Sequence, residues 1–250
     1  MIHGGIDGFS RLVVYLHAST NNRASTVLAL FREAISYYNV PSRVRSDGFG
    51  KRRGWKVYDT NGRSEQEQYH NCIINSVHNQ RIERLWGEVN RVVVSRFLNI
   101  FLFLERRGAF DPNNETDIYA LHFVFIPLIN VAFSELSRQW NDHPVTTESN
   151  YSPRQLWTQG MLQLGSSHLS AVRDVIEGEN LNFEEFGIEE EGPLPSIEES
   201  ETVSVPESPI QLSNAEVLLL RQEVSTVPVD EHGIMSYLTA LGVLGRTEHL

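Results

Sequence analysis

Residues 2–16, IHGGIDGFSRLVVYL, predict how this chain begins to fold. Two short runs rich in Ile, Val, Leu and Tyr flank Gly8-Phe9-Ser10-Arg11, a pattern typical of an antiparallel β-hairpin that opens a sheet. Asp7 then lies at the end of the first strand. Residues 25–38 follow with the apolar spacing of an amphipathic helix, and this order of elements indicates an α/β crossover.

Beyond that helix, Pro41 closes the segment, and Arg43-Val44-Arg45-Ser46 predicts a short strand. This strand delivers Asp47 at its C-terminal end, where open α/β sheets usually bind their ligands. Residues 48–62 are rich in glycine and charge, which predicts a loop, with a further strand at residues 55–58.

Asn79 is expected to start a long helix that leaves Glu83 and Arg91 on a different face from its apolar stripe. The stripe consists of Ile82, Leu85, Trp86, Val89, Val92 and Val93. Residues 111–115 predict a turn and a helix cap, and the helix that follows is expected to be buried and to run to Trp140.

The composition limits the class of protein. The single cysteine, Cys72, has no partner for an intramolecular disulfide, and no signal peptide is visible, so we expect an intracellular protein, nuclear or cytoplasmic. The longest apolar stretch, residues 118–133, is shorter than the roughly 20 residues of a membrane span. We therefore expect no membrane association.

Charge divides the chain into two parts. Residues 1–160 carry a net charge of +3, which is compatible with DNA as a partner, whereas residues 161–250 carry −14. The acidic and proline-containing second part predicts a mostly flexible C-terminal tail, with short helices at residues 212–220 and 233–244 that could dock a protein partner. The predicted domains are thus residues 1–160 and 161–250.

Three acidic residues form a candidate catalytic set: Asp7, Asp47 and Glu83, the last two separated by 35 residues. Phosphodiester chemistry uses two hard cations to activate the attacking oxygen and to stabilise the leaving oxygen. Carboxylates are suitable ligands for Mg²⁺ or Mn²⁺. Among 32 acidic residues, spacing alone is a weak signal, so the local sequence has to support it.

The sequence around each of the three acidic residues supports the set, because it resembles a known family. Residues 6–11, IDGFSR, resemble the first-strand signature of retroviral-type integrase and transposase cores; residues 44–48, VRSDG, and 79–86, NQRIERLW, are similar to the second-strand and glutamate-helix segments. Residues 140–144, WNDHP, and 152–157, SPRQLW, are like the segment that closes many transposase cores. Residues 76–86 and 120–125 look like transposon-derived integrase core domain proteins.

The resemblance implies a ribonuclease H-like α/β fold, with a central mixed sheet flanked by helices and, in this chain, a largely disordered acidic tail. It implies that Asp7, Asp47 and Glu83 bind Mg²⁺ or Mn²⁺ and support cleavage of DNA and strand transfer. It also implies a homo-oligomer. Gly48-Phe49-Gly50 departs from the family pattern after Asp47, and the expected end-recognition module does not precede the first strand, which predicts either a fragment or a loss of end recognition.

Basic residues near the carboxylates are candidate nucleic-acid contacts. Lys51, Arg52 and Arg53 follow Asp47 closely, and they form either a phosphate-binding loop or a solvated one. Arg81 and Arg84 flank Glu83 and either bind a phosphate or pair with Glu88.

Two other functions are compatible with the same sequence. One is a non-catalytic scaffold that binds nucleic acid or protein partners and keeps only the fold; the other is a ribonuclease H acting on hybrids. The acidic tail has two interpretations. It either folds over the basic side of the core in place of nucleic acid and inhibits the protein, or it is simply solvated.

Overall fold

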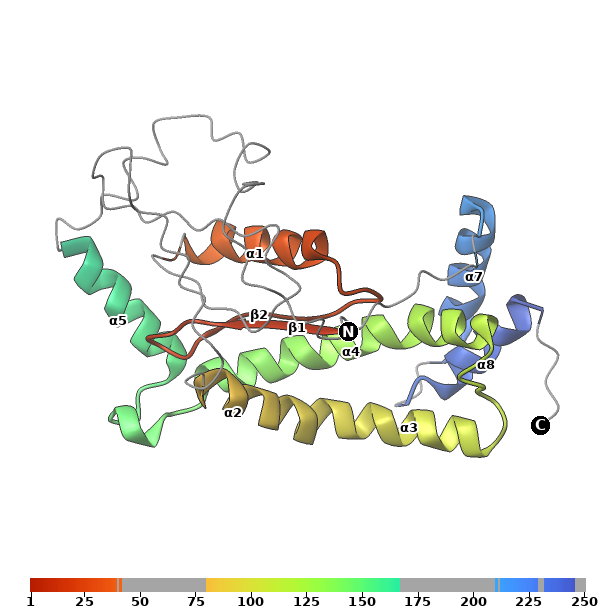
Figure 1. Ribbon diagram of the computed structural model, residues 1–250, viewed down its shortest axis with the longest axis horizontal. Helices are drawn as coiled ribbons and strands as arrows, with labels where there is room; N and C mark the ends of the chain where they lie inside the picture. The colour runs from red at the N-terminus through yellow and green to blue at the C-terminus, as the bar shows by residue number, and fades with distance from the viewer. Residues whose placement is uncertain (40, 42–79, 167–209, 211, 229–231, 246–250) are drawn as a thin grey trace, which may run out of the picture.

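The computed structural model describes residues 1–39, 41, 80–166, 210, 212–228 and 232–245 (Figure 1). The hairpin consists of strands β1 (Ile2–Ile6) and β2 (Val13–Ala18). The helices are α1 (Ala24–Tyr38), α2 (Gln80–Val89), the π-helical turn η3 (Asn90–Val94), α3 (Ser95–Arg106), α4 (Glu115–Asp142), the 3-10 turn η4 (Thr146–Glu148), α5 (Pro153–Ser166), α7 (Asn214–Thr226) and α8 (Ile234–Val243).

The hairpin confirms the prediction for the first residues of the chain. β1 and β2 pair antiparallel, Ile2 opposite Ala18 and Gly5 opposite Tyr15, and the register shifts between Gly5 and Ile6. α1 lies along one side of the hairpin, and α4 with α2 along the other (Figure 1). The described residues are mostly helical and form only these two strands, so the expected central mixed sheet is seen in part; residues 43–46 and 55–58, predicted as strands, lie outside the described ranges.

Two asparagine side chains attach α4 to the outer edge of β2. Asn141 accepts a hydrogen bond from the Val13 N–H (2.8 Å) and donates one to the Val13 carbonyl (3.1 Å). Asn130 makes the same two bonds with Ala18, at 2.7 and 3.1 Å. The eleven residues from Asn130 to Asn141 rise about 16.5 Å along the helix, and the five residues from Val13 to Ala18 rise about 16.5 Å along the strand. The two asparagine side chains are therefore spaced to meet the two strand residues.

α2, η3 and α3 form one continuous helix, and the spacing of its buried apolar residues accounts for the π turn in its middle. Leu85, Val89, Val93 and Phe97 recur every four residues, and all four are buried. In a regular α-helix that spacing would rotate the stripe by about 40° per step, and the π turn absorbs the drift by taking in one extra residue. Of the two valines predicted in the stripe at this turn, Val93 is buried, whereas Val92 is 39% exposed.

Helices α7 and α8 belong to the packed core. Leu220, Ala240 and Leu241 are fully buried, and the ring of Tyr237 packs against that of Phe125 at 6.0 Å between centroids. The predicted helices at residues 212–220 and 233–244 are thus confirmed as helices. α8 packs against α4 and α7 packs against α8, so part of their apolar surface is buried within the chain itself. The predicted domain boundary at residue 160 falls inside α5.

Helix α4 is the one described helix that is long and apolar enough to cross a membrane, judged by length and composition. It begins at the Asn114 cap, as predicted, and continues through Pro127. Its residues Val124 and Phe133 are buried among the neighbouring elements, whereas Val131 is exposed.

Candidate functional site

The turn between β1 and β2 is closed by the carboxylate of Asp7. Its Oδ2 atom accepts hydrogen bonds from the Ser10 N–H (2.7 Å), the Ser10 hydroxyl (2.6 Å) and the Phe9 N–H (3.2 Å). Ser10 is fully buried beneath this turn. Oδ1 takes no part in these bonds, so one of the two carboxylate oxygens closes the turn.

Arg11 completes the turn in the left-handed region, with φ of 65°. Such a conformation is costly for a non-glycine residue and persists only when its neighbours hold it. The Arg11 carbonyl accepts a hydrogen bond from the Trp140 indole N–H (2.9 Å), and its guanidinium pairs with Glu148 and donates to the Thr147 hydroxyl. The end of α4 and the turn η4 therefore fix the shape of the Asp7 turn.

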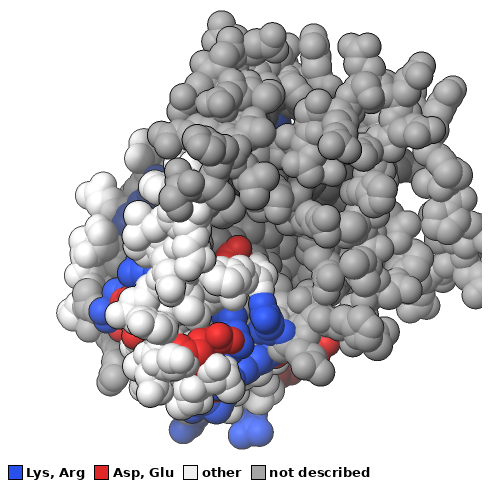
Figure 2. Space-filling model, turned by 90° about the vertical axis from the view of Figure 1, so that its left-hand side faces the viewer, with Lys and Arg blue, Asp and Glu red and all other residues white. Residues whose placement is uncertain are grey.

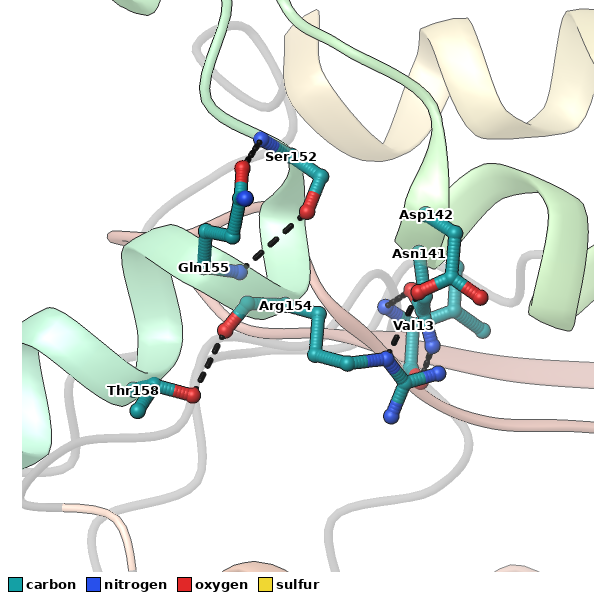
Figure 3. Close-up of polar contacts among 7 residues, drawn as sticks. All are labelled: Val13, Asn141, Asp142, Ser152, Arg154, Gln155 and Thr158. Atoms are coloured by element: carbon teal, nitrogen blue, oxygen red, sulfur yellow. Dashed lines mark hydrogen bonds and ion pairs between the residues drawn. The ribbon is translucent and has the colours of Figure 1, made fainter.

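Figure 3 shows how the segment after α4 is held together. Asp142 accepts a hydrogen bond from the Arg154 guanidinium at 2.7 Å, across the connection from α4 to α5. At the start of α5, the Ser152 N–H donates to the Gln155 side chain (2.8 Å) and the Gln155 N–H donates to the Ser152 hydroxyl (3.3 Å). This reciprocal pair is a capping box, which stabilises the first turn of a helix.

Helix α5 also joins the end of α1 to the hairpin turn. The Trp157 ring meets the Tyr38 ring edge-on at 5.7 Å between centroids. At Gly160, a methyl group in place of the missing side chain would lie 3.1 Å from the Phe9 ring. The motif at residues 140–157, identified by resemblance, thus acts in the fold by joining β2, α1, α4 and α5; sequence patterns alone did not reveal these contacts.

Glu83 lies in the first turn of α2, and its side chain is exposed. Trp86, one turn further along, packs on β1: a Cβ added at Gly4 would meet the Trp86 ring at 3.0 Å. α2 begins toward the half of the hairpin that ends in the turn (Figure 1). Helix α2, which carries Glu83, therefore contacts β1, the strand that precedes Asp7; that the two carboxylates belong to one site stays a prediction.

Basic side chains accompany Glu83. Arg81 and Arg84 are both exposed, and neither makes an ion pair within the described ranges. Glu88, the alternative partner considered for them, pairs instead with Arg91 at 2.7 Å, and this hydrogen bond raises the pKa of Arg91. Figure 2 shows this end of the molecule, where Lys and Arg side chains lie next to Asp and Glu side chains.

The other candidate residues lie outside the described part of the chain. These are Asp47 and the basic run Lys51, Arg52 and Arg53. Among the described residues, no three His, Cys, Asp or Glu side chains gather into a group that could hold a metal ion. The three-carboxylate set consequently stays a prediction.

Replacing Asp7 by alanine is expected to lower the free energy of unfolding by about 2–3 kcal/mol, because three hydrogen-bond donors of the turn lose their common acceptor. Asp7→Asn keeps an acceptor oxygen and should change the stability by less than about 1 kcal/mol. Urea unfolding followed by circular dichroism measures both. Equal losses in the two variants would contradict the role of the carboxylate as the acceptor that closes the turn.

Comparison with known proteins adds one match. A family model described as an integrase core domain matches residues 1–171, which include the hairpin and all elements from α1 to α5. No curated protein and no solved structure matches the chain.

Proposed function

Because this chain belongs to the integrase core domain family, we propose that it is a metal-dependent polynucleotidyl transferase that cleaves and joins DNA strands. The observation that supports the proposal is the position of Glu83 on α2, a helix held against β1, the strand that leads into Asp7. Asp47 completes the set in the proposal. The reaction class is DNA integration.

The donor atoms fit a hard divalent cation. Glu83 is exposed, and Asp7 has its Oδ1 outside the bonds of the turn, so both offer carboxylate oxygens, the donors that Mg²⁺ and Mn²⁺ prefer. When bound, the metal would lower the pKa of the attacking water or hydroxyl and neutralise charge on the leaving oxygen. In the proposal Asp47 and Glu83 are the principal ligands, and Asp7 contributes a single oxygen.

The protein's own residues would orient the substrate. Arg81 and Arg84 present guanidinium groups on the same helix as Glu83, where they can bind the phosphates on either side of the scissile bond. Lys51, Arg52 and Arg53 are proposed to extend this contact along the DNA backbone.

Three further expectations belong to the proposal. The protein acts as a homo-oligomer, its acidic C-terminal part engages a protein partner, and it works in the nucleus or the cytoplasm. The charge of −14 in residues 161–250 supports a protein partner for this part of the chain, because so much negative charge repels DNA.

The test is a cleavage assay with the full chain on a labelled DNA duplex and, in parallel, on an RNA–DNA hybrid, in Mg²⁺ or Mn²⁺ and again with EDTA. We expect metal-dependent cleavage of the DNA duplex. Cleavage of the hybrid alone would reassign the protein as a ribonuclease H. Absence of cleavage on both substrates in both metals would overturn the catalytic proposal.

The engagement of Asp7 in the turn favours a second candidate function, a domesticated scaffold that keeps the fold and binds nucleic acid or proteins without turnover. Asp7→Asn separates the two roles of this residue, because it keeps the acceptor for the turn and removes the charge that a metal needs. If Asp7 is a metal ligand, this variant loses cleavage while staying folded. If cleavage is unchanged, Asp7 serves the turn only and the metal set is confined to Asp47 and Glu83.

A further inference from the structure

The hairpin turn that contains Asp7 depends on one residue in an unfavourable conformation. Its backbone is closed by hydrogen bonds from the Asp7 N–H to the Leu12 carbonyl (2.7 Å) and from the Arg11 N–H to the Asp7 carbonyl (2.9 Å). Arg11 has a left-handed φ of 65°, which non-glycine residues rarely adopt. Such a conformation persists only when surrounding contacts hold it, so the turn needs support from outside the hairpin.

Arg11 receives that support from α4 and η4. The Trp140 indole N–H donates to its carbonyl at 2.9 Å, and its guanidinium donates to the Thr147 hydroxyl at 3.2 Å and pairs with the Glu148 carboxylate. The Arg11 side chain is 20% exposed, against 72% for Arg91 in its ion pair within one helix. Exposed pairs of that kind contribute little, whereas the more shielded pair of Arg11 and Glu148 joins segments 137 residues apart.

Glu148 is itself presented by a closed loop. The Val145 carbonyl accepts hydrogen bonds from the N–H groups of Glu148 (3.0 Å) and Asn150 (3.1 Å). The Tyr151 N–H donates to the Glu148 carbonyl at 3.0 Å, and the Val145 N–H donates to the Tyr151 carbonyl at the same distance. Ser149 and Asn150 are both left-handed, with φ of 55° and 63°. These bonds fix the backbone that carries Glu148, so its carboxylate meets Arg11 from a defined position.

The support reaches the Asp7 carboxylate through Ser10, the residue before Arg11. The Ser10 N–H and hydroxyl donate to Asp7 Oδ2 at 2.7 and 2.6 Å, and the Ser10 hydroxyl oxygen accepts from the Leu12 N–H at 3.2 Å. The orientation of Asp7 is therefore tied to the residues on both sides of Arg11. We propose that Glu148 is a positioning residue: by holding Arg11, it fixes the direction in which Asp7 presents its carboxylate. This inference rests on the proposed function and deepens it.

A positioning residue has a distinct kinetic signature. Glu148 makes its contact within the protein, so its loss should alter the geometry of the reacting groups and leave the affinity for DNA unchanged. The assay uses the 250-residue chain and labelled duplex DNA in Mn²⁺. Glu148→Ala is expected to lower kcat by about 10- to 100-fold with KM unchanged. Glu148→Gln keeps an acceptor oxygen for the guanidinium and should keep most of the rate.

Glu135→Ala is the matched control, because Glu135 also pairs with an arginine, Arg138 at 2.7 Å, in a pair contained within α4. It should cleave at the wild-type rate. A double variant tests the route of the effect. Arg11→Gly removes the pair and accommodates the left-handed φ without strain. If Glu148 acts through Arg11, adding Glu148→Ala to Arg11→Gly should slow cleavage no further, and an additional loss would contradict that route.

Hydrogen exchange followed by NMR examines the turn without DNA. The Ser10 amide, a donor to Asp7, should exchange about 10-fold faster in Glu148→Ala than in the wild type. The Ala18 amide, which donates to Asn130, should be unchanged and reports that the hairpin remains folded. Unchanged exchange at Ser10 would overturn the inference, and so would faster exchange with an unchanged kcat.

The two measurements also separate this inference from the proposed function. A wild-type protein that cleaves neither DNA nor a hybrid overturns the proposed function, and the role of Glu148 in the reaction is lost with it. The exchange of the Ser10 amide still shows in that case whether Glu148 holds the turn. A wild-type protein that cleaves DNA and a Glu148→Ala variant with the same kcat overturn the positioning role alone.

Discussion

Asn141→Ala is expected to lower the free energy of unfolding by about 2–6 kcal/mol, because each of two buried backbone groups loses its only side-chain partner at about 1–3 kcal/mol. Both groups belong to Val13, which is 3% exposed, and Asn141 is itself 4% exposed. Water therefore has little access to replace the lost bonds. Chemical unfolding monitored by fluorescence and circular dichroism measures the difference.

Asn130→Ala is the matched control, since Asn130 makes the same pair of bonds with Ala18 at a site that is only partly buried. We expect a loss of about 1–2 kcal/mol there, because Asn130 is itself partly exposed and water can enter the space that its side chain leaves. Asn141→Asp keeps the acceptor for the Val13 N–H and loses the donor to its carbonyl, so its stability should lie between those of the wild type and Asn141→Ala. Equal effects at positions 130 and 141 would contradict the attachment of α4 described here.

Glu83→Gln is expected to reduce the rate of DNA cleavage by about 10³-fold or more, comparable with the removal of one preorganised electrostatic group from an enzyme site. The substitution keeps the size of the side chain and removes its charge. Because Glu83 is exposed at the first turn of α2, the fold should be unaffected, and a single-turnover assay on labelled duplex DNA can compare the variants directly.

Glu88→Gln is the control on the same helix, because Glu88 is an acidic residue paired with Arg91 and lies outside the proposed set. It should retain wild-type cleavage. Asp47→Asn should match Glu83→Gln, and the double variant should be no slower than either, since residues that act as one unit are not additive. A Glu83→Gln protein that cleaves at the wild-type rate would remove this residue from the mechanism.

The short-range features of this fold were predictable from sequence. The hairpin at residues 2–18 and helix α1 follow from local apolar patterns and turn residues, and the Asn114 cap with helix α4 follows from the same signals. The polar residues before the apolar stripe predict Glu83 in the first turn of a helix, and the structure confirms that position.

The features that sequence did not reveal depend on contacts between distant residues. Nothing local to Asn141 indicates that its amide bonds to β2, 128 residues earlier. From the sequence, Asp7 is equally compatible with a metal ligand and with a residue that closes a turn. Only the three hydrogen bonds that it accepts in the structure reveal the second role. The burial of Tyr237 against α4 could not be inferred from an acidic, proline-containing context.

Isothermal calorimetry with Mn²⁺ on the 250-residue chain tests the central claim most directly, because it measures metal binding without requiring a DNA substrate. The wild-type protein and Glu88→Gln should show the same saturable binding, whereas Glu83→Gln and Asp47→Asn should bind at least about 10-fold more weakly, a difference of about 1.4 kcal/mol. Equal, weak binding in all four proteins would contradict a metal site built on Asp47 and Glu83.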